Sequence, residues 1–184
     1  MSQVFNQNIV LETERLVLRF IDKKDEDAIF ENVFHDKEAL KYYIAEYKEN
    51  REEFSIDKLI DYSINTQRYM LAIILKEDGK CIGMIHQCST PDNIFRTSEI
   101  GYVLGSNYWH KGYATESLKA FINYLFEIGI HKVFCGHIIE NAASGKVMQK
   151  VGMIYEGTKV HDIYYHDKYW DCNYYYLINP KEKF

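Results

Sequence analysis

The sequence has few of the residues that divide a chain into separate parts. Its 184 residues include two prolines, Pro91 and Pro180, and ten glycines, with no Pro/Gly/Ser-rich linker, internal repeat or low-complexity tract. Such segments mark domain boundaries. Because a chain of this length can bury a sizeable core by itself, the sequence predicts a single domain over residues 1–184, with a core at about 10–179.

Cysteine is sparse and scattered. Cys81, Cys88, Cys135 and Cys172 form no Cys-x-x-Cys pair, and no histidine lies at a zinc-finger spacing from them. Thiolate metal sites use such close pairs. The pattern favours buried, reduced thiols, since free cysteine is a commonly buried residue, and it predicts no metal. A structural disulfide or a metal site are the alternatives.

Positive charge and long apolar runs are also lacking. Lys and Arg total 22 against 27 Asp and Glu, a net charge of −5. This balance argues against nucleic acid or an anionic membrane surface as a partner. No stretch reaches the roughly 18 apolar residues of a membrane span, and the amino terminus lacks the pattern of a signal peptide. We therefore expect a soluble, cytoplasmic protein.

The sequence does contain clear strand and helix patterns. Apolar periodicity predicts helices from Asp22, around 52–67, after Gly112 and from Asn141 to Lys150. The order β-α-α-β-β-β-α-β-α-β-β indicates a mixed α/β domain. Strand patterns occupy residues 15–20, 70–75, 81–87, 97–104, 133–139, 157–165 and 169–178. The strongest helix carries one apolar stripe, made of Leu118, Phe121, Ile122, Leu125 and Phe126.

The segment at residues 108–116, Tyr-Trp-His-Lys-Gly-Tyr-Ala-Thr-Glu, leaves a predicted strand and opens this strong helix. A helix amino terminus exposes unpaired N–H groups and the positive end of the helix dipole, which together bind phosphate groups. Gly112 allows close approach to the backbone. The segment alone is compatible with a pyrophosphate site or with an ordinary turn before a helix.

A glycine, Gly101, interrupts the strand just before that segment, in Glu-Ile-Gly-Tyr-Val-Leu at 99–104. Glycine within a strand marks a bulge or a close backbone approach. If the strand separates from its neighbour here, its N–H groups can bind an extended ligand, and one can bind a developing oxyanion. Glu99 alone fits either a functional or a solvated carboxylate.

A third segment, Asn-Ala-Ala-Ser at 141–144, ends a strand and begins a helix. Asn141 fits a helix cap, and the two small alanines leave room for a ligand beside the helix. Ser144 presents a hydroxyl one turn into the helix, as a ligand contact or as an ordinary surface serine.

Together, in this order and spacing, these segments resemble the GNAT superfamily of N-acetyltransferases, and more narrowly its RimJ/RimL-like branch. The most specific marks are Tyr-Trp-x-Lys-Gly-Tyr-Ala-Thr-Glu and Asn-x-Ala-Ser followed by Lys-x-Gly-x-x-x-Glu-Gly. Residues 11–19 are similar to the opening strand of that branch, and residues 76–83 to its central hairpin. The resemblance implies a GNAT-like acyl-CoA N-acyltransferase fold with splayed central strands, and acetyl-CoA as cosubstrate.

The resemblance also implies roles for individual residues. The amides of Val103 and Leu104 are expected to bind the acetyl and pantetheine carbonyls, and Asn141 the pantetheine arm. The backbone of residues 110–115 is expected to hold the pyrophosphate, and Ser144 to lie near the thioester sulfur. The full expected set for the cofactor is Tyr102, Val103, Leu104, His110, Lys111, Gly112, Tyr113, Ala114, Thr115, Asn141 and Ser144.

Two positions depart from the family pattern. Many relatives have glycine at the position of His110, whose side chain can narrow the phosphate site, add a cationic contact or point away. The tyrosine that many GNAT enzymes use to protonate the departing sulfur falls at Met148, which cannot donate a proton. Ser144 or water therefore has to supply it.

We expect direct transfer in a ternary complex, because no cysteine in these segments lies beside a recognisable base. The acceptor amine, with a pKa of roughly 8 to 10.4, must lose a proton before it attacks. Glu99 is the expected base, through one or two waters, with its pKa raised by partial burial. The expected catalytic residues are thus Glu99 and Ser144.

The acceptor is open at this stage. It is expected between the first two helices and the last hairpin, as a protein N-terminal amine or as a small amine such as a polyamine or an antibiotic. A non-catalytic acyl-CoA-binding module is the alternative from another class, a nucleic-acid-binding module is a third, and the protein is expected to be a monomer or a homodimer. Candidate walls, which pack equally well as ordinary core, are Tyr42, Tyr43, Tyr47, Tyr164, Tyr165 and Trp170.

Overall fold

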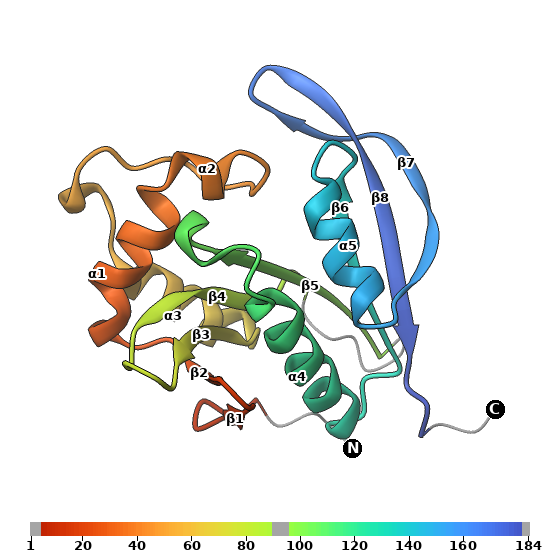
Figure 1. The fold of residues 1–184 in the computed structure, drawn as a ribbon, viewed down its shortest axis with the longest axis horizontal. Coiled ribbons are helices and arrows are strands. Elements are labelled where there is room, and N and C mark those ends of the chain that lie inside the picture. Colours follow the sequence, from red (N-terminus) through yellow and green to blue (C-terminus); the bar gives the residue numbers. More distant parts are fainter. Residues whose placement is uncertain (1–4, 90–95, 182–184) are drawn as a thin grey trace.

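The computed structural model describes residues 5–89 and 96–181. Its centre is an eight-stranded sheet in the order β1-β2-β3-β4-β5-β6-β8-β7 (Figure 1). Described neighbours are antiparallel except for the β5–β6 pair, which is parallel. The strands are β1 Val10–Glu12, β2 Leu16–Phe20, β3 Met70–Leu75, β4 Cys81–Gln87, β5 Thr97–Leu104, β6 Lys132–Ile138, β7 Ile154–Tyr165 and β8 Lys168–Ile178.

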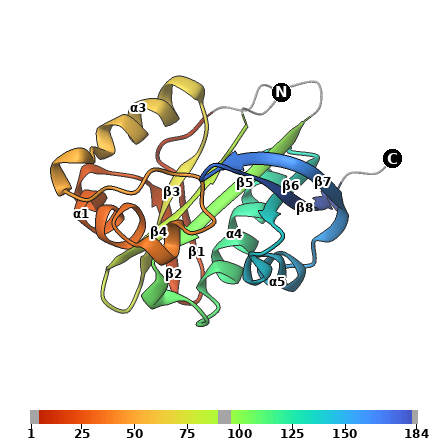
Figure 2. The same ribbon diagram turned by 90° about the horizontal axis from the view of Figure 1, so that it is seen from above.

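Helices cover both faces of this sheet (Figure 2). One core lies under α4 and α5 and includes Leu118 and Phe121 from the apolar stripe of α4, which are fully buried. The other core lies under α1, α2 and α3. After the places expected from the sequence for the two substrates, we label these the cofactor face and the acceptor face of the sheet, respectively. The helices are α1 Glu26–Ile29, α2 Lys37–Leu40, α3 Ile56–Thr66, α4 Tyr113–Glu127 and α5 Ala142–Lys150.

The element order predicted from the sequence is confirmed, with two additions. The opening segment is not one strand, because the Thr13 amide donates to the Leu16 carbonyl at 3.0 Å and the Leu16 amide donates to the Thr13 hydroxyl at 2.9 Å. These two bonds close a turn between β1 and β2. Helix α2 was not predicted. It spans four residues capped by Asp36, which is too short to show an apolar period.

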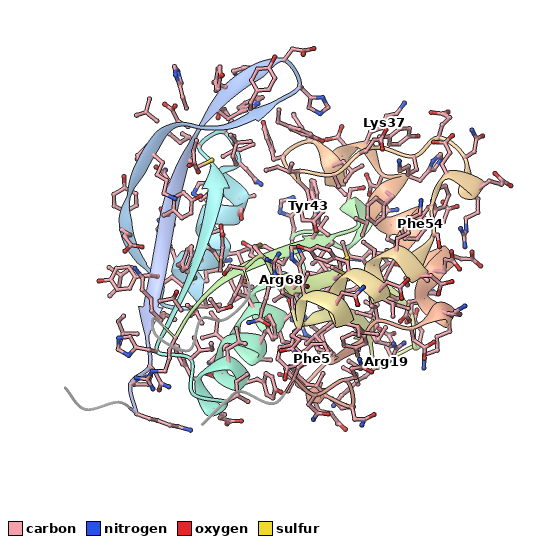
Figure 3. All side chains as sticks on the ribbon, turned by 180° about the vertical axis from the view of Figure 1, so that it is seen from behind. Phe5, Arg19, Lys37, Tyr43, Phe54 and Arg68 are labelled. Atoms are coloured by element: carbon pink, nitrogen blue, oxygen red, sulfur yellow. The ribbon has the colours of Figure 1, made fainter. Side chains whose placement is uncertain are left out.

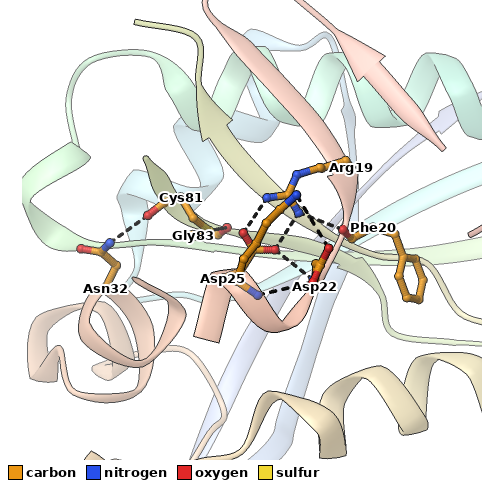
Figure 4. Close-up of polar contacts among 8 residues, drawn as sticks. Arg19, Phe20, Asp22, Asp25, Asn32, Cys81 and Gly83 are labelled. Atoms are coloured by element: carbon orange, nitrogen blue, oxygen red, sulfur yellow. Dashed lines mark hydrogen bonds and ion pairs between the residues drawn. The ribbon is translucent and has the colours of Figure 1, made fainter. Parts of the chain in front are cut away.

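Charged groups hold the start of α1 against β2 (Figure 4). Arg19 donates to both carboxylate oxygens of Asp25, at 2.7 and 2.6 Å. Asp25 is buried and also accepts from the backbone of Asp22, which caps the same turn as the sequence predicts. Across α1, Asn32 donates to the carbonyl of Cys81 on β4. These contacts fix the helical layer on the acceptor face.

The four cysteines are free thiols, and Cys81, Cys135 and Cys172 are buried. Within the described ranges, no cluster of histidine, cysteine and carboxylate side chains has the arrangement of a metal site. In the same ranges, no helix has the length and apolar character needed to span a bilayer.

Candidate active site

The two central parallel strands separate after a short paired stretch. Thr97–Glu99 of β5 pairs with Lys132–Phe134 of β6. From residue 135 onward, β6 has register partners only on β8 among the described strands, and the two ribbons diverge in Figure 1. Residues 100–104 therefore form an edge on the β6 side of β5, as the predicted splayed strands require.

Backbone groups of β5 point alternately toward β4 and toward this open edge. The Gly105 amide donates to the Ile82 carbonyl, and the Cys88 amide donates to the Glu99 carbonyl. Because the Gly105 bond lies beside the opposed residues Leu104 and Gly83, these two form a non-hydrogen-bonded pair of the antiparallel ladder. The Val103 amide therefore faces β4. The amides of Tyr102 and Leu104 face the open edge, where an extended ligand can accept from them.

The loop before α4 exposes the amino terminus of a 15-residue helix. Its N-cap is Gly112, with φ of 84° and no side-chain cap, so the first backbone N–H groups are not taken up by a capping side chain. Arg15 stabilises this loop, because its guanidinium donates to the Lys111 carbonyl at 3.0 Å and forms an ion pair with the Glu116 carboxylate at 2.6 Å. Such a terminus is suited to phosphate groups.

His110 is exposed and adopts φ of 62°, a left-handed conformation that costs most residues about 1–2 kcal/mol. A glycine at this position would avoid this cost. We predict that His110→Gly raises the free energy of unfolding by up to about 1 kcal/mol, measured by denaturant titration.

Calorimetry with CoA tests the side chain of His110 separately. Since the expected phosphate site consists of backbone groups, we expect His110→Gly and His110→Ala to keep the dissociation constant for CoA within about twofold of wild type. A tenfold weakening in both variants would instead assign a direct contact to the imidazole.

The start of α5 brings together residues from the third segment. Asn141 caps the helix by accepting from the amide of Ser144 at 3.3 Å, as predicted. The phenol of Tyr102 lies 2.8 Å from the Ser144 hydroxyl, so a side chain from the diverging part of β5 reaches α5 on the cofactor face. Met148, one turn further along α5, is buried.

Glu99 lies at the end of the paired stretch of β5 and is half-buried. Burial raises the pKa of its carboxyl group, nearby Lys159 lowers it, and Asp162 raises it again, with a net upward direction. Asp162 accepts from the phenol of Tyr174 at 2.7 Å. The direction of the shift is the one that a base working near neutral pH needs.

The aromatic residues predicted as walls separate into two groups. Trp170 packs edge-on against Tyr42 at 6.2 Å, and Tyr165 donates to the carbonyl of Ala45, so the hairpin of β7 and β8 contacts the segment after α2. Tyr47 instead stacks on His35 in the helical layer. A remaining candidate, Tyr164, is 61% exposed and lies outside this contact.

Sequence reasoning missed a polar cluster on the acceptor face. Tyr43, one of the predicted walls, is labelled in Figure 3. Its phenol oxygen lies 2.8 Å from Nε2 of His86 on β4. Burial lowers the pKa of His86 to about 4, so this imidazole is neutral at pH 7. Its ring fills the space that Gly101 leaves open. Gly101 in the strand pattern indicated a close approach at this point, but it did not identify His86 as the residue that approaches.

A cavity of about 490 Å³ borders the beginning of the loop before α4, at Tyr108. It is bounded by β2, α1 and the turn between β3 and β4, and its lining includes Arg19, Lys24, Asn32 and Lys80. None of the residues predicted for catalysis or cofactor binding lines it.

Residues 15–154 match the acetyltransferase (GNAT) domain. The chain is 32% identical to an uncharacterised N-acetyltransferase, YnaD, of Bacillus subtilis (strain 168), over 92% of this chain and 96% of that protein. The fold is shared with ribosomal-protein-S5-alanine acetyltransferase from Vibrio fischeri, with a TM-score of 0.78, 21% identity, and coverage of 95% and 99% of the two chains. It is also shared with spermidine N-acetyltransferase from Vibrio cholerae in complex with CoA and spermine, with a TM-score of 0.78, 20% identity, and coverage of 92% and 98%.

The chain therefore belongs to the GNAT family, and its relatives include RimJ-like proteins, as the motifs indicate. It is an acetyl-CoA-dependent N-acetyltransferase. The residues at the site fit this cofactor, because an open strand edge and an uncapped helix terminus offer backbone donors for carbonyl and phosphate oxygens.

Proposed function

We propose that the protein is a single catalytic domain that transfers the acetyl group directly to a primary amine, in a ternary complex. The observation that carries this proposal is the separation of β5 from β6 next to the uncapped terminus of α4. The open-edge amides of Tyr102 and Leu104 bind the carbonyl groups of the pantetheine thioester. The backbone of residues 110–115 binds the pyrophosphate, and Asn141 bonds the pantetheine arm.

Glu99 acts as the general base from the acceptor face. Its half-buried carboxylate takes the proton of the acceptor ammonium through water, which leaves the amine lone pair free to attack. The Leu104 amide donates to the thioester oxygen as negative charge develops there. Ser144 donates its hydroxyl to the departing sulfur, and water returns the proton that the thiolate needs.

The proposed acceptor is a protein N-terminal amine, with a small amine such as a polyamine as the second candidate. The ring contact of Tyr42 with Trp170 and the hydrogen bond from Tyr165 to the Ala45 carbonyl bring the β7–β8 hairpin against the segment after α2. A border of this kind suits a narrow, extended chain, which fits both candidates. The fold neighbours from the two Vibrio species have names that cover both classes, so they do not choose between them.

Thiol release from acetyl-CoA, followed with a panel of peptide amino termini and polyamines, tests the function. We expect amine-dependent release, with acetylated product confirmed by mass spectrometry. CoA binding without thiol release toward any amine would contradict transfer and favour a non-catalytic acyl-CoA-binding module.

A further inference from the structure

The strand residue Tyr102 contacts the first turn of α5 through its phenol. Its phenol oxygen lies 2.8 Å from the Ser144 hydroxyl oxygen and 3.2 Å from the Ser144 carbonyl oxygen. We propose that Tyr102 is a positioning residue that directs the Ser144 hydroxyl toward the thioester sulfur. This inference rests on the proposed function, and it assigns the orientation of the group that stabilises the leaving thiolate.

The Tyr102 phenol can donate its proton to either of two oxygens of Ser144. Each hydroxyl has one proton and can also accept. When Tyr102 donates to the Ser144 hydroxyl oxygen, the serine proton is free to point at sulfur. When Tyr102 donates to the Ser144 carbonyl, the serine proton points back at the phenol. Negative charge developing on sulfur favours the first arrangement.

The surroundings keep the phenol in the form that can donate. Burial, the largest cause, raises the pKa of Tyr102 above its ordinary value, and nearby Cys135 acts in the same direction. The phenol is therefore protonated throughout the pH range in which the amine is acetylated. Without that donor, a serine in the first turn of a helix bonds to its own backbone, and the thiolate loses its partner.

Helix α5 contains no tyrosine of its own. Because Met148 is buried and has no proton to donate, α5 supplies no phenol of its own here. Tyr102 brings one from β5, and the Asn141 cap holds the Ser144 backbone in place. In the step itself, the C–S bond breaks, its electron pair goes to sulfur, Ser144 donates a hydrogen bond to the thiolate, and water later protonates it.

The ionisation of bound CoA is a readout that does not depend on turnover. A thiolate that accepts from Ser144 is stabilised, so the pKa of the bound CoA thiol falls. We expect it to lie about one unit below the roughly 8.5 of an ordinary thiol, measured by the ultraviolet absorbance of the thiolate during a pH titration. Tyr102→Phe and Ser144→Ala should each return it to within about 0.3 units of the free value.

Turnover provides the second readout, with the best amine of the panel and with acetyl-CoA hydrolysis as an acceptor-independent probe. We expect Tyr102→Phe to lower kcat about tenfold, a loss of about 1.4 kcal/mol, with the CoA dissociation constant unchanged within twofold. In the Ser144→Ala background, Tyr102→Phe should cause no further loss, because both residues act through one hydrogen bond.

Tyr175→Phe is the matched control. Tyr175 is a buried phenol that also contacts α5, where it accepts from Gln149 at 3.2 Å, and it lies outside the proposed chemistry. It should keep both kcat and the bound-thiol pKa. The positioning role alone is overturned if Tyr102→Phe keeps the wild-type pKa of the bound thiol. It is also overturned if the fall in kcat caused by Tyr102→Phe adds in full to the fall caused by Ser144→Ala. Failure of the wild-type protein to release thiol overturns the proposed function as well.

Discussion

Replacement of Glu99 by glutamine should lower kcat about 100-fold at pH 7, in the range typical of a lost general base. The residual rate should rise with pH up to the pKa of the acceptor amine, because the variant depends on amine that is already deprotonated in solution. The wild-type rate should instead fall only below the raised pKa of Glu99. The pH dependence of kcat at saturating acetyl-CoA checks both profiles.

Stability and cofactor affinity provide the controls for this variant. Burial raises the folded-state pKa of Glu99 above its unfolded value, so its ionisation costs the folded state free energy as pH rises through that interval. Glu99→Gln removes this cost and should be at least as stable as wild type at pH 8. A variant that is folded and binds CoA, yet turns over like wild type at every pH, excludes Glu99 from the mechanism.

Replacement of Gly83 by alanine should destabilise the protein by about 3 kcal/mol or more, since overpacking and backbone strain each cost about 1–3 kcal/mol. The new Cβ would lie 2.2 Å from the Val103 carbonyl oxygen and 2.8 Å from the Leu104 Cα. Both contacts are with backbone, so β5 has to move where it supplies the open-edge amides. For a domain of this size, the expected fall in Tm is about 6–12 °C.

Gly79→Ala is the matched control for Gly83→Ala. Gly79 lies in the turn between β3 and β4 with φ of 71°, and nothing lies within 4 Å of an added Cβ. Its cost should be only the left-handed strain of about 1–2 kcal/mol, with no change in the KM for acetyl-CoA. If Gly83→Ala melts no lower than Gly79→Ala, the close approach of β4 and β5 is not as described.

Local patterns in the sequence were sufficient for most of the fold. The strands predicted at 70–75, 81–87 and 97–104 have the observed bounds. The first is a continuous apolar run, and Asp78-Gly79 and Gly105 are turn residues that limit the strands beside them. The cap at Asn141 was equally local. The turn at Thr13 was not predicted, since the hydrogen bonds between Thr13 and Leu16 close it within a continuous strand pattern that contains no glycine, proline or asparagine.

The motifs located the candidate site, but not the contacts within it. Tyr102 and Ser144 are 42 positions apart, and their contact depends on how far β5 diverges from β6, which no local pattern encodes. The same applies to Tyr43 and His86, which are 43 positions apart. The direction of each β5 amide could be assigned only from the observed ladder with β4. In that ladder the Val103 amide points at β4, and the Tyr102 and Leu104 amides point at the open edge.

Residue-resolved amide hydrogen exchange with and without acetyl-CoA tests the central claim most directly, that the open edge of β5 binds the thioester arm. We expect the Tyr102 and Leu104 amides to gain protection on binding, while Val103, already directed at β4, stays unchanged. Saturating acetyl-CoA that leaves the exchange of Tyr102 and Leu104 unaltered would contradict the account.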